Sequence, residues 1–253
     1  MSEYTDIIDG IQAYGRNYGL IYTRKCGWID LGHANPQGAS TLYRKVQEAN
    51  GAGILRRWFF YGQPMRKRIF GSQWWGGLDV GSYYNLDAQL TPDQVKSVAL
   101  GIFMDVSTMT ENFQLSLSRF TDSGFSAEDL VSNVLGFYRA VNPGYPYIAL
   151  CEPVSLREAQ HVWNTYGAVG SNKNMNFRPY LYPTSPGSEQ GLVSASLPRF
   201  LDTIIPEAPG ALYSRLSGPP PFLPKLEHKE APNYSPWRRR QGPMQSLRPK
   251  KLP

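Results

Sequence analysis

The clearest pattern of apolar and polar positions lies in the middle of the chain. Thr91, Pro92 and Gln94 supply an N-cap, a proline at the first helical position and a capping-box glutamine, so a helix is expected to begin there. Apolar residues then recur at helical spacing along one side of this helix: Val95, Val98, Ala99, Ile102, Val106, Met109 and Phe113. The opposite side carries Leu100, Met104 and Leu115. A helix that is apolar on both sides is expected to pass through the interior of the protein.

Shorter patterns on either side of this helix predict a mixture of strands and helices. Helices are expected at residues 5–14, where isoleucines recur at helical spacing, at 36–49, from 126 to the NPG sequence at 142–144, and at 155–167, and strands at 19–23 and 28–31. The helix from 126 is expected to begin with a serine cap at Ser126 and the carboxylates of Glu128 and Asp129 in its first turn, and the one from 155 with a capping box of Ser155 and Glu158. Residues 54–75 contain two strand-like runs on either side of the GQP sequence at 62–64, which predicts a hairpin with its turn at GQP. The expected fold class is α+β, a single domain with short strands packed around the buried central helix.

The composition changes at residue 218, where nine prolines occur within the last 36 residues. This stretch also holds eight of the 26 basic and two of the 20 acidic residues, which leaves 18 of each in residues 1–217. The formal net charge of +6 therefore belongs to the tail, and the body is neutral. We expect a globular domain at residues 1–217 and a basic proline-rich arm, extended or disordered, at 218–253. The arm is expected to contact a protein partner or an acidic surface, whereas nucleic-acid binding is not favoured by the neutral body.

Two features of the sequence bear on where the protein works. The N-terminal sequence MSEYTDIIDG lacks the basic and apolar regions of a classical signal peptide, and no apolar run approaches the roughly 20 residues of a membrane span. We therefore expect a cytoplasmic product as synthesised, with no membrane span, and export would need a signal-independent secretion system. The two cysteines, Cys26 and Cys151, are too few for a disulfide scaffold and are expected to be buried free thiols.

The sequence YTRKCGWIDLGH at residues 22–33 is the best candidate for a chemical site. Asp30 and His33, together with Glu111 or Asp105 from the central helix, would give an acid–base site, because burial raises the pKa of a carboxyl group into the range useful for proton transfer. The same groups could hold a divalent metal. With one histidine at hand and no HExxH or CxxC pattern, however, no metal and no cofactor are predicted.

Two other interpretations of this segment stay open. Cys26 could act as a nucleophile with His33 or His161 as its base and Asp30 orienting the imidazole. Alternatively, Asp30 and His33 could be satisfied by backbone groups in a tight turn, with Glu111 paired to an arginine. The sequence contains no GxGxxG, GxxxxGK[ST] or GxSxG pattern, which argues against nucleotide-dependent chemistry and ordinary serine hydrolysis.

Two stretches together, YTRKCGWIDLGH and SGFSAEDLVSNVLG at residues 123–136, resemble an uncharacterised family of bacterial proteins with the motifs YT..GG.ID.GH and FS.EDL.SN..G. The resemblance covers roughly residues 18–215 and brings no established activity. That family carries a Trp-His-Glu on its central helix, and here the corresponding residues are Met109, Thr110 and Glu111. The resemblance thus implies an Asp/His/Glu arrangement and disfavours a site with two histidines. The family has glycine at the place of Cys26, which lowers the expectation of a nucleophilic thiol.

These observations lead to one leading functional hypothesis and two alternatives. The leading one is a bacterial hydrolase, acting on a cell-envelope polymer, in which Glu111 is the general acid or base and His33 activates or positions water. Its expected substrate-binding side chains are Tyr22, Trp58, Trp74 and Trp75. The first alternative is a non-enzymatic adaptor or secreted effector subunit that binds its partner through the arm. The second is a hydrolase with a Cys/His nucleophile.

Overall fold

The structure is a computed structural model, and it describes residues 2–52, 57–68, 74–116, 125–184, 191–216 and 222–228. It combines helices with antiparallel sheets, which confirms the predicted α+β class. No helix within these residues is long and apolar enough to cross a membrane.

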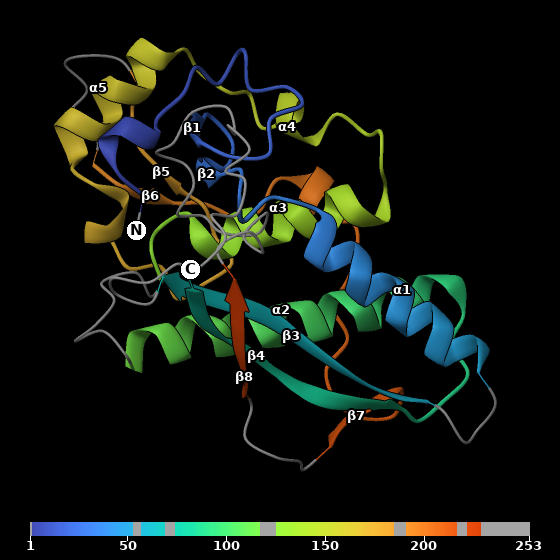
Figure 1. The fold of residues 1–253 in the computed structure, drawn as a ribbon. Helices are drawn as coiled ribbons and strands as arrows, with labels where there is room; N and C mark the ends of the chain where they lie inside the picture. The colour runs from blue at the N-terminus through green and yellow to red at the C-terminus, as the bar shows by residue number, and fades with distance from the viewer. Residues whose placement is uncertain are drawn as a thin grey trace.

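The central helix, α2 (Pro92–Ser116), begins where the sequence predicts. The Thr91 hydroxyl accepts a hydrogen bond from the Gln94 N–H, and the Gln94 side chain accepts one from the Thr91 N–H, so the capping box is confirmed. In Figure 1, α2 lies between the long β3–β4 pair and the helices α1 (Gln37–Gly51) and α3 (Asp129–Val141), and it contacts all four elements. Its burial on opposite sides, at Val98 and Leu100 for example, follows from this position.

The main sheet is built around strand β4 (Trp74–Leu86). It pairs along one side with β3 (Trp58–Arg68), and it also pairs with β7 (Tyr213–Leu216) through residues 83–86 and with β8 (Phe222–His228) through residues 74–80. The prediction of a turn at GQP is wrong, because Gly62, Gln63 and Pro64 continue β3 opposite β4. Among the described strands β3 pairs only with β4, and an edge strand tolerates a proline because one side of its ladder is unpaired.

A second, smaller sheet is the hairpin of β1 (Leu20–Thr23) and β2 (Gly27–Asp30), and it is buried on both faces. Ile21 and Ile29 face the main core, which also contains α1, α2 and α3. Leu20 and Trp28 face a smaller core that includes residues of α5 (Leu156–Tyr166). The hairpin therefore separates two apolar clusters, which explains why all eight of its strand residues are buried.

The helix predicted at residues 5–14 is wrong. A single 3-10 turn, η1 (Tyr4–Asp6), is followed by Ile7 paired in parallel with Leu20, and the Ile8 N–H donates to the Leu20 carbonyl. The Asp9 carboxylate accepts the Ile11 N–H, a local turn that competes with a helix. Pairing with β1 and this turn replace the helix that the spacing of the isoleucines suggested.

The remaining elements are short and lie mainly in the second half of the chain. They are α4 (Tyr147–Leu150), η3 (Val169–Ser171), η4 (Arg199–Leu201) and the two-residue strands β5 (Tyr180–Leu181) and β6 (Val193–Ser194), which pair with each other. Helix α5 begins at the predicted Ser155–Glu158 capping box, which is confirmed.

Part of the predicted arm belongs to the main sheet, because β8 lies within residues 218–253 and pairs with β4. Residues 218–221 and 229–253 lie outside the described residues. The arm's role in binding a partner or an acidic surface therefore stays a prediction.

Candidate functional site

The loop after β2 carries the first residue of the site, His33. Asp30, at the end of β2, accepts the Gly32 N–H on Oδ1 at 2.7 Å, and its own N–H donates to Ser132 Oγ at 2.9 Å. Asp30 is thus held in a tight turn of the kind that the structural interpretation anticipated. The side chain of His33 is 29% exposed, so this turn presents an imidazole that reaches solvent.

Helix α3 packs closely on this loop because residue 136 is a glycine. A Cβ on Gly136 would lie 3.0 Å from the His33 carbonyl oxygen and 3.2 Å from the Asn35 carbonyl oxygen. The Arg139 guanidinium, one turn further along α3, donates to the Ala34 carbonyl at 2.6 Å. The backbone that carries His33 is therefore fixed by α3.

The second residue, Glu111, lies near the end of α2 and is buried with 1% of its surface exposed. Its Oε2 accepts the Phe125 N–H at 2.9 Å. Phe125 has a φ of 55°, which is uncommon for a residue with a side chain and marks a locally strained backbone. The chain thus adopts an unfavourable conformation at the point where it offers a backbone donor to the buried carboxylate.

The third residue, Asp129, is the first residue of α3 and is also buried. Its Oδ2 accepts the Ser126 N–H at 2.8 Å, and its Oδ1 lies 3.8 Å from His33 Nε2. The predicted serine cap is wrong: the N-cap position is occupied by Glu128, and the Ser126 hydroxyl has no hydrogen-bond partner. The half of the capping box that does form is the bond from the Ser126 backbone to Asp129.

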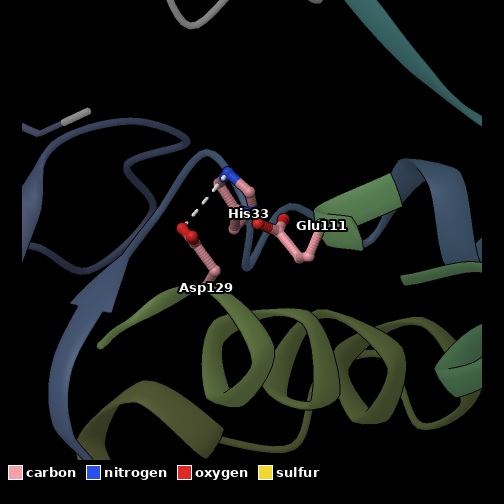
Figure 2. Close-up of side chains that lie close together, drawn as sticks. All are labelled: His33, Glu111 and Asp129. Carbon is pink, nitrogen blue, oxygen red and sulfur yellow. Dashed lines mark ion pairs between the residues drawn. The ribbon is translucent and has the colours of Figure 1, made fainter. Parts of the chain in front are cut away.

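These three side chains converge, as Figure 2 shows. One potential ligand atom from each of His33, Glu111 and Asp129 lies within 4.8 Å of the other two. They come from the loop after β2, from α2 and from the start of α3, so segments distant in the sequence meet here (Figure 2). The predicted approach of His33 and Glu111 is present, and Asp129 rather than Asp30 completes the cluster.

Burial and mutual repulsion make the acidic groups of the cluster resist ionisation. Burial is the main cause that raises the pKa of Glu111, and the charge of His33 and the Phe125 N–H partly oppose it. Burial raises the pKa of Asp129 well above its usual range, and the negative charges of Glu111, Glu128 and Asp30 add to this effect. The carboxyl groups of Glu111 and Asp129 lie close enough for one of them, when protonated, to donate a hydrogen bond to the other. Two carboxyl groups in such contact hold one proton between them more readily than they ionise together.

Few of the described basic side chains are paired with these acidic groups. The salt bridges of the described residues include no lysine or arginine paired with Glu111 or Asp129, so the predicted arginine partner of Glu111 is absent from them. The charge of Lys173, an exposed residue, lowers the pKa of Glu111. His33, when protonated, places a positive charge within 3.8 Å of Asp129.

Three unpartnered polar atoms belong to residues within four positions of Asp129 in the chain. The described residues contain four buried side-chain nitrogen or oxygen atoms without a hydrogen-bond partner, and three of them are Ser126 Oγ, Glu128 Oε2 and Asn133 Nδ2. Asn133 lies one turn after Asp129 on the same face of α3. Buried polar atoms in folded proteins nearly always have partners, so this concentration distinguishes the start of α3 from the rest of the interior.

The other residues proposed for proton transfer or nucleophilic attack lie elsewhere. Cys26 is buried with its sulfur 3.3 Å from the sulfur of Cys151, and both are free thiols, as predicted. None of the described hydrogen bonds joins Cys26 to His33 or His161. Asp105 faces the sheet, where its carboxylate accepts the Tyr84 hydroxyl at 2.7 Å and lies 3.7 Å from Arg215.

Two of the four aromatic residues predicted to bind substrate, Tyr22 and Trp58, make their described contacts away from the cluster. Tyr22 is buried in the smaller core, and its hydroxyl donates to the Tyr182 carbonyl at 2.8 Å. Trp58 is 59% exposed on β3, beside Tyr83. Trp74 and Trp75 begin β4, and their side chains lie outside the described part of the structure.

Sequence reasoning missed Asp129 and Glu128 as members of the site. Both were attributed to helix capping, and the capping interaction does account for one oxygen of Asp129. The available signal was the second motif, SGFSAEDLVSNVLG, which contains Glu128, Asp129 and the unpartnered Ser126 and Asn133. A run of polar residues in a helix whose other positions are apolar indicates an interior polar site more than a capped end.

Comparison of the chain with known protein families, with curated proteins and with solved structures finds no match in any of the three. The resemblance of the two motifs to a bacterial family therefore stays a prediction.

Proposed function

We propose that the protein is a hydrolase that activates water between His33, Glu111 and Asp129. The observation that supports this proposal is the meeting of two buried carboxyl groups with one partly exposed imidazole within 4.8 Å. Stability alone does not favour such an arrangement, because each buried carboxylate loses hydration, and the salt bridges of the described residues pair neither of them with an arginine or lysine.

The three groups supply complementary chemistry. His33 reaches solvent, so it can contact the attacking water and accept its proton, and its Nε2 lies 3.8 Å from Asp129 Oδ1. Glu111 keeps its proton to higher pH because it is buried, and this suits a general acid that protonates the leaving group. The water contributes its oxygen to the product, and its proton passes to the leaving group through these side chains.

The test is a hydrolysis screen on the full chain with esters, amides, phosphoesters and glycosides, including cell-envelope glycan and peptide, the class anticipated from the sequence. Any activity found is then measured for His33→Ala, Glu111→Gln and Asp129→Asn. Asp105→Asn is the matched control, because Asp105 is a carboxylate on the same helix that faces the sheet instead. Each site variant is expected to lose at least about 100-fold in kcat/KM, as is typical for acid–base groups.

Two outcomes would contradict the proposal. One is the absence of hydrolysis of every bond class by a folded wild-type protein. The other is an activity that the three site variants retain at the level of Asp105→Asn.

A further inference from the structure

We propose that His33, Glu111 and Asp129 bind one divalent transition-metal ion of the zinc type. The inference deepens the proposed function: use of the ion in hydrolysis rests on that function, whereas binding of the ion does not. Three features of the described residues lead to it, namely the spacing of the donor atoms, the way in which each carboxylate is anchored, and the uncompensated charge and unpartnered polar atoms around them.

The donor atoms are spaced nearly as an ion requires. Ligands about 2.1 Å from a tetrahedral zinc ion lie about 3.4 Å from one another. His33 Nε2 and Asp129 Oδ1 are 3.8 Å apart, and no pair in the cluster is separated by more than 4.8 Å. His33 is the partly exposed member, so a modest movement of its ring towards the two buried carboxylates would complete the geometry.

Each carboxylate has one oxygen fixed by a backbone N–H. Phe125 holds Oε2 of Glu111 and Ser126 holds Oδ2 of Asp129, and these donors are consecutive in the chain. The other oxygen of Asp129 is the one that faces His33. Hydrogen bonds that orient a ligand from its far side are the usual support of a metal site, and here the support includes the strained backbone of Phe125.

The charge of the cluster calls for a cation. The negative charges of Asp30, Glu111 and Glu128 act on Asp129 in the interior, and among the described residues His33 and the exposed Lys173 act on Glu111 as cations. A divalent ion would offset two of these negative charges. Glu128 Oε2 and Asn133 Nδ2, which are buried and unpartnered on residues within four positions of Asp129, are polar atoms to which the water of a hydrated ion could bond.

The donor set selects the kind of ion. An imidazole nitrogen with two carboxylate oxygens suits zinc, manganese or iron better than calcium or magnesium, which prefer oxygen alone. Three protein ligands leave at least one position for water, as in catalytic rather than structural zinc sites. An ion there would act as a Lewis acid on its own bound water, in place of proton transfer by His33 and Glu111, whose donor atoms the ion would then occupy.

The experiment is a zinc titration of the full chain by calorimetry after removal of metals with a chelator, repeated with cobalt, whose visible absorption reports coordination. One equivalent of each ion is expected to bind to the wild type. His33→Ala, Glu111→Gln and Asp129→Asn are expected to weaken binding at least about 100-fold, more than loss of a supporting group would. His161→Ala is the control and should bind as the wild type, because His161 lies on α5 and outside the cluster.

Failure to bind either ion, or binding that the folded His33→Ala variant retains, overturns the inference. His33→Ala is the decisive variant because the His33 side chain is the partly exposed member of the cluster, so its loss should leave the fold intact. Circular dichroism will verify that the variant is folded. Zinc binding without hydrolysis would support the metal site and refute the proposed function. Hydrolysis that persists in a protein unable to bind either ion would refute the metal site and leave the proposed function standing.

Discussion

Glu128 provides a direct test of the electrostatics described above, through the substitution Glu128→Gln. The side chain is 1% exposed; Oε1 accepts the Ser2 hydroxyl at 3.0 Å and Oε2 has no partner. Burial raises its pKa to about 7, the charge of Asp30 acts in the same direction, and the Ser2 hydrogen bond and His33 oppose the shift. Glutamine keeps the size and an acceptor for Ser2 but carries no charge.

The magnitude follows from linkage between protonation and folding. The interval between the ordinary value of 4.5 and the value of about 7 corresponds to about 3 kcal/mol, at about 1.4 kcal/mol per pH unit. Below pH 4.5 the folded and unfolded chains both hold the proton, so the stabilising term is fully present. As the pH rises to 7, the unfolded chain releases the proton first and the wild type loses this stability; above 7 the loss is complete.

The variant is therefore expected to match the wild type in acid and to exceed its free energy of unfolding by up to about 3 kcal/mol above pH 7. Urea unfolding of the chelator-treated proteins across this pH range measures the difference. Glu48→Gln is the matched control: Glu48 is 66% exposed on α1, and its substitution should have little effect at any pH. A Glu128→Gln protein that is less stable than the wild type above pH 7, or a difference independent of pH, would refute the reasoning.

Three further predictions concern packing. Gly136→Ala should lower the free energy of unfolding by about 1–3 kcal/mol, because its methyl group would meet the loop after β2; thermal denaturation beside Gly51→Ala, where nothing lies within 4 Å, checks this. Tyr22→Phe should cost about 1–3 kcal/mol in urea unfolding because its backbone partners lose their bonds, while zinc affinity stays unchanged; a loss of zinc affinity would contradict its structural role. Cys26 and Cys151 should not react with a thiol reagent in the native protein and should both react in denaturant, since both are buried and the hydrogen bond with Cys26, together with burial, raises the pKa of Cys151; rapid native labelling would contradict this.

Elements fixed by interactions between near neighbours in the chain were predictable. The helices that begin at Pro92 and Leu156 each depend on a capping box, in which the hydrogen bonds join residues three apart. The failures come from contacts between distant residues. Ile7 pairs with Leu20 instead of continuing a helix, and residues 62–64 continue β3 because β4 offers partners along its whole length.

The candidate site was predictable in part for the same reason. His33 and Glu111 stood out because a histidine in a glycine-rich turn and a carboxylate in an apolar helix are each unusual locally. Asp129 did not, because a local hydrogen bond to Ser126 explained it. Its second oxygen faces His33 only because Gly136 lets α3 approach the loop, and sequence patterns do not report such a close approach.

The β1–β2 hairpin, with an apolar cluster on each face, has a consequence for how the protein unfolds. Neither cluster can lose its contacts without exposing one face of strands that the other cluster also covers. The two clusters should therefore melt in one cooperative transition rather than as separate units. Since His33 follows β2 directly, damage to the smaller cluster, at Trp28 or Val162 for instance, would reach the site through the hairpin although neither residue belongs to it.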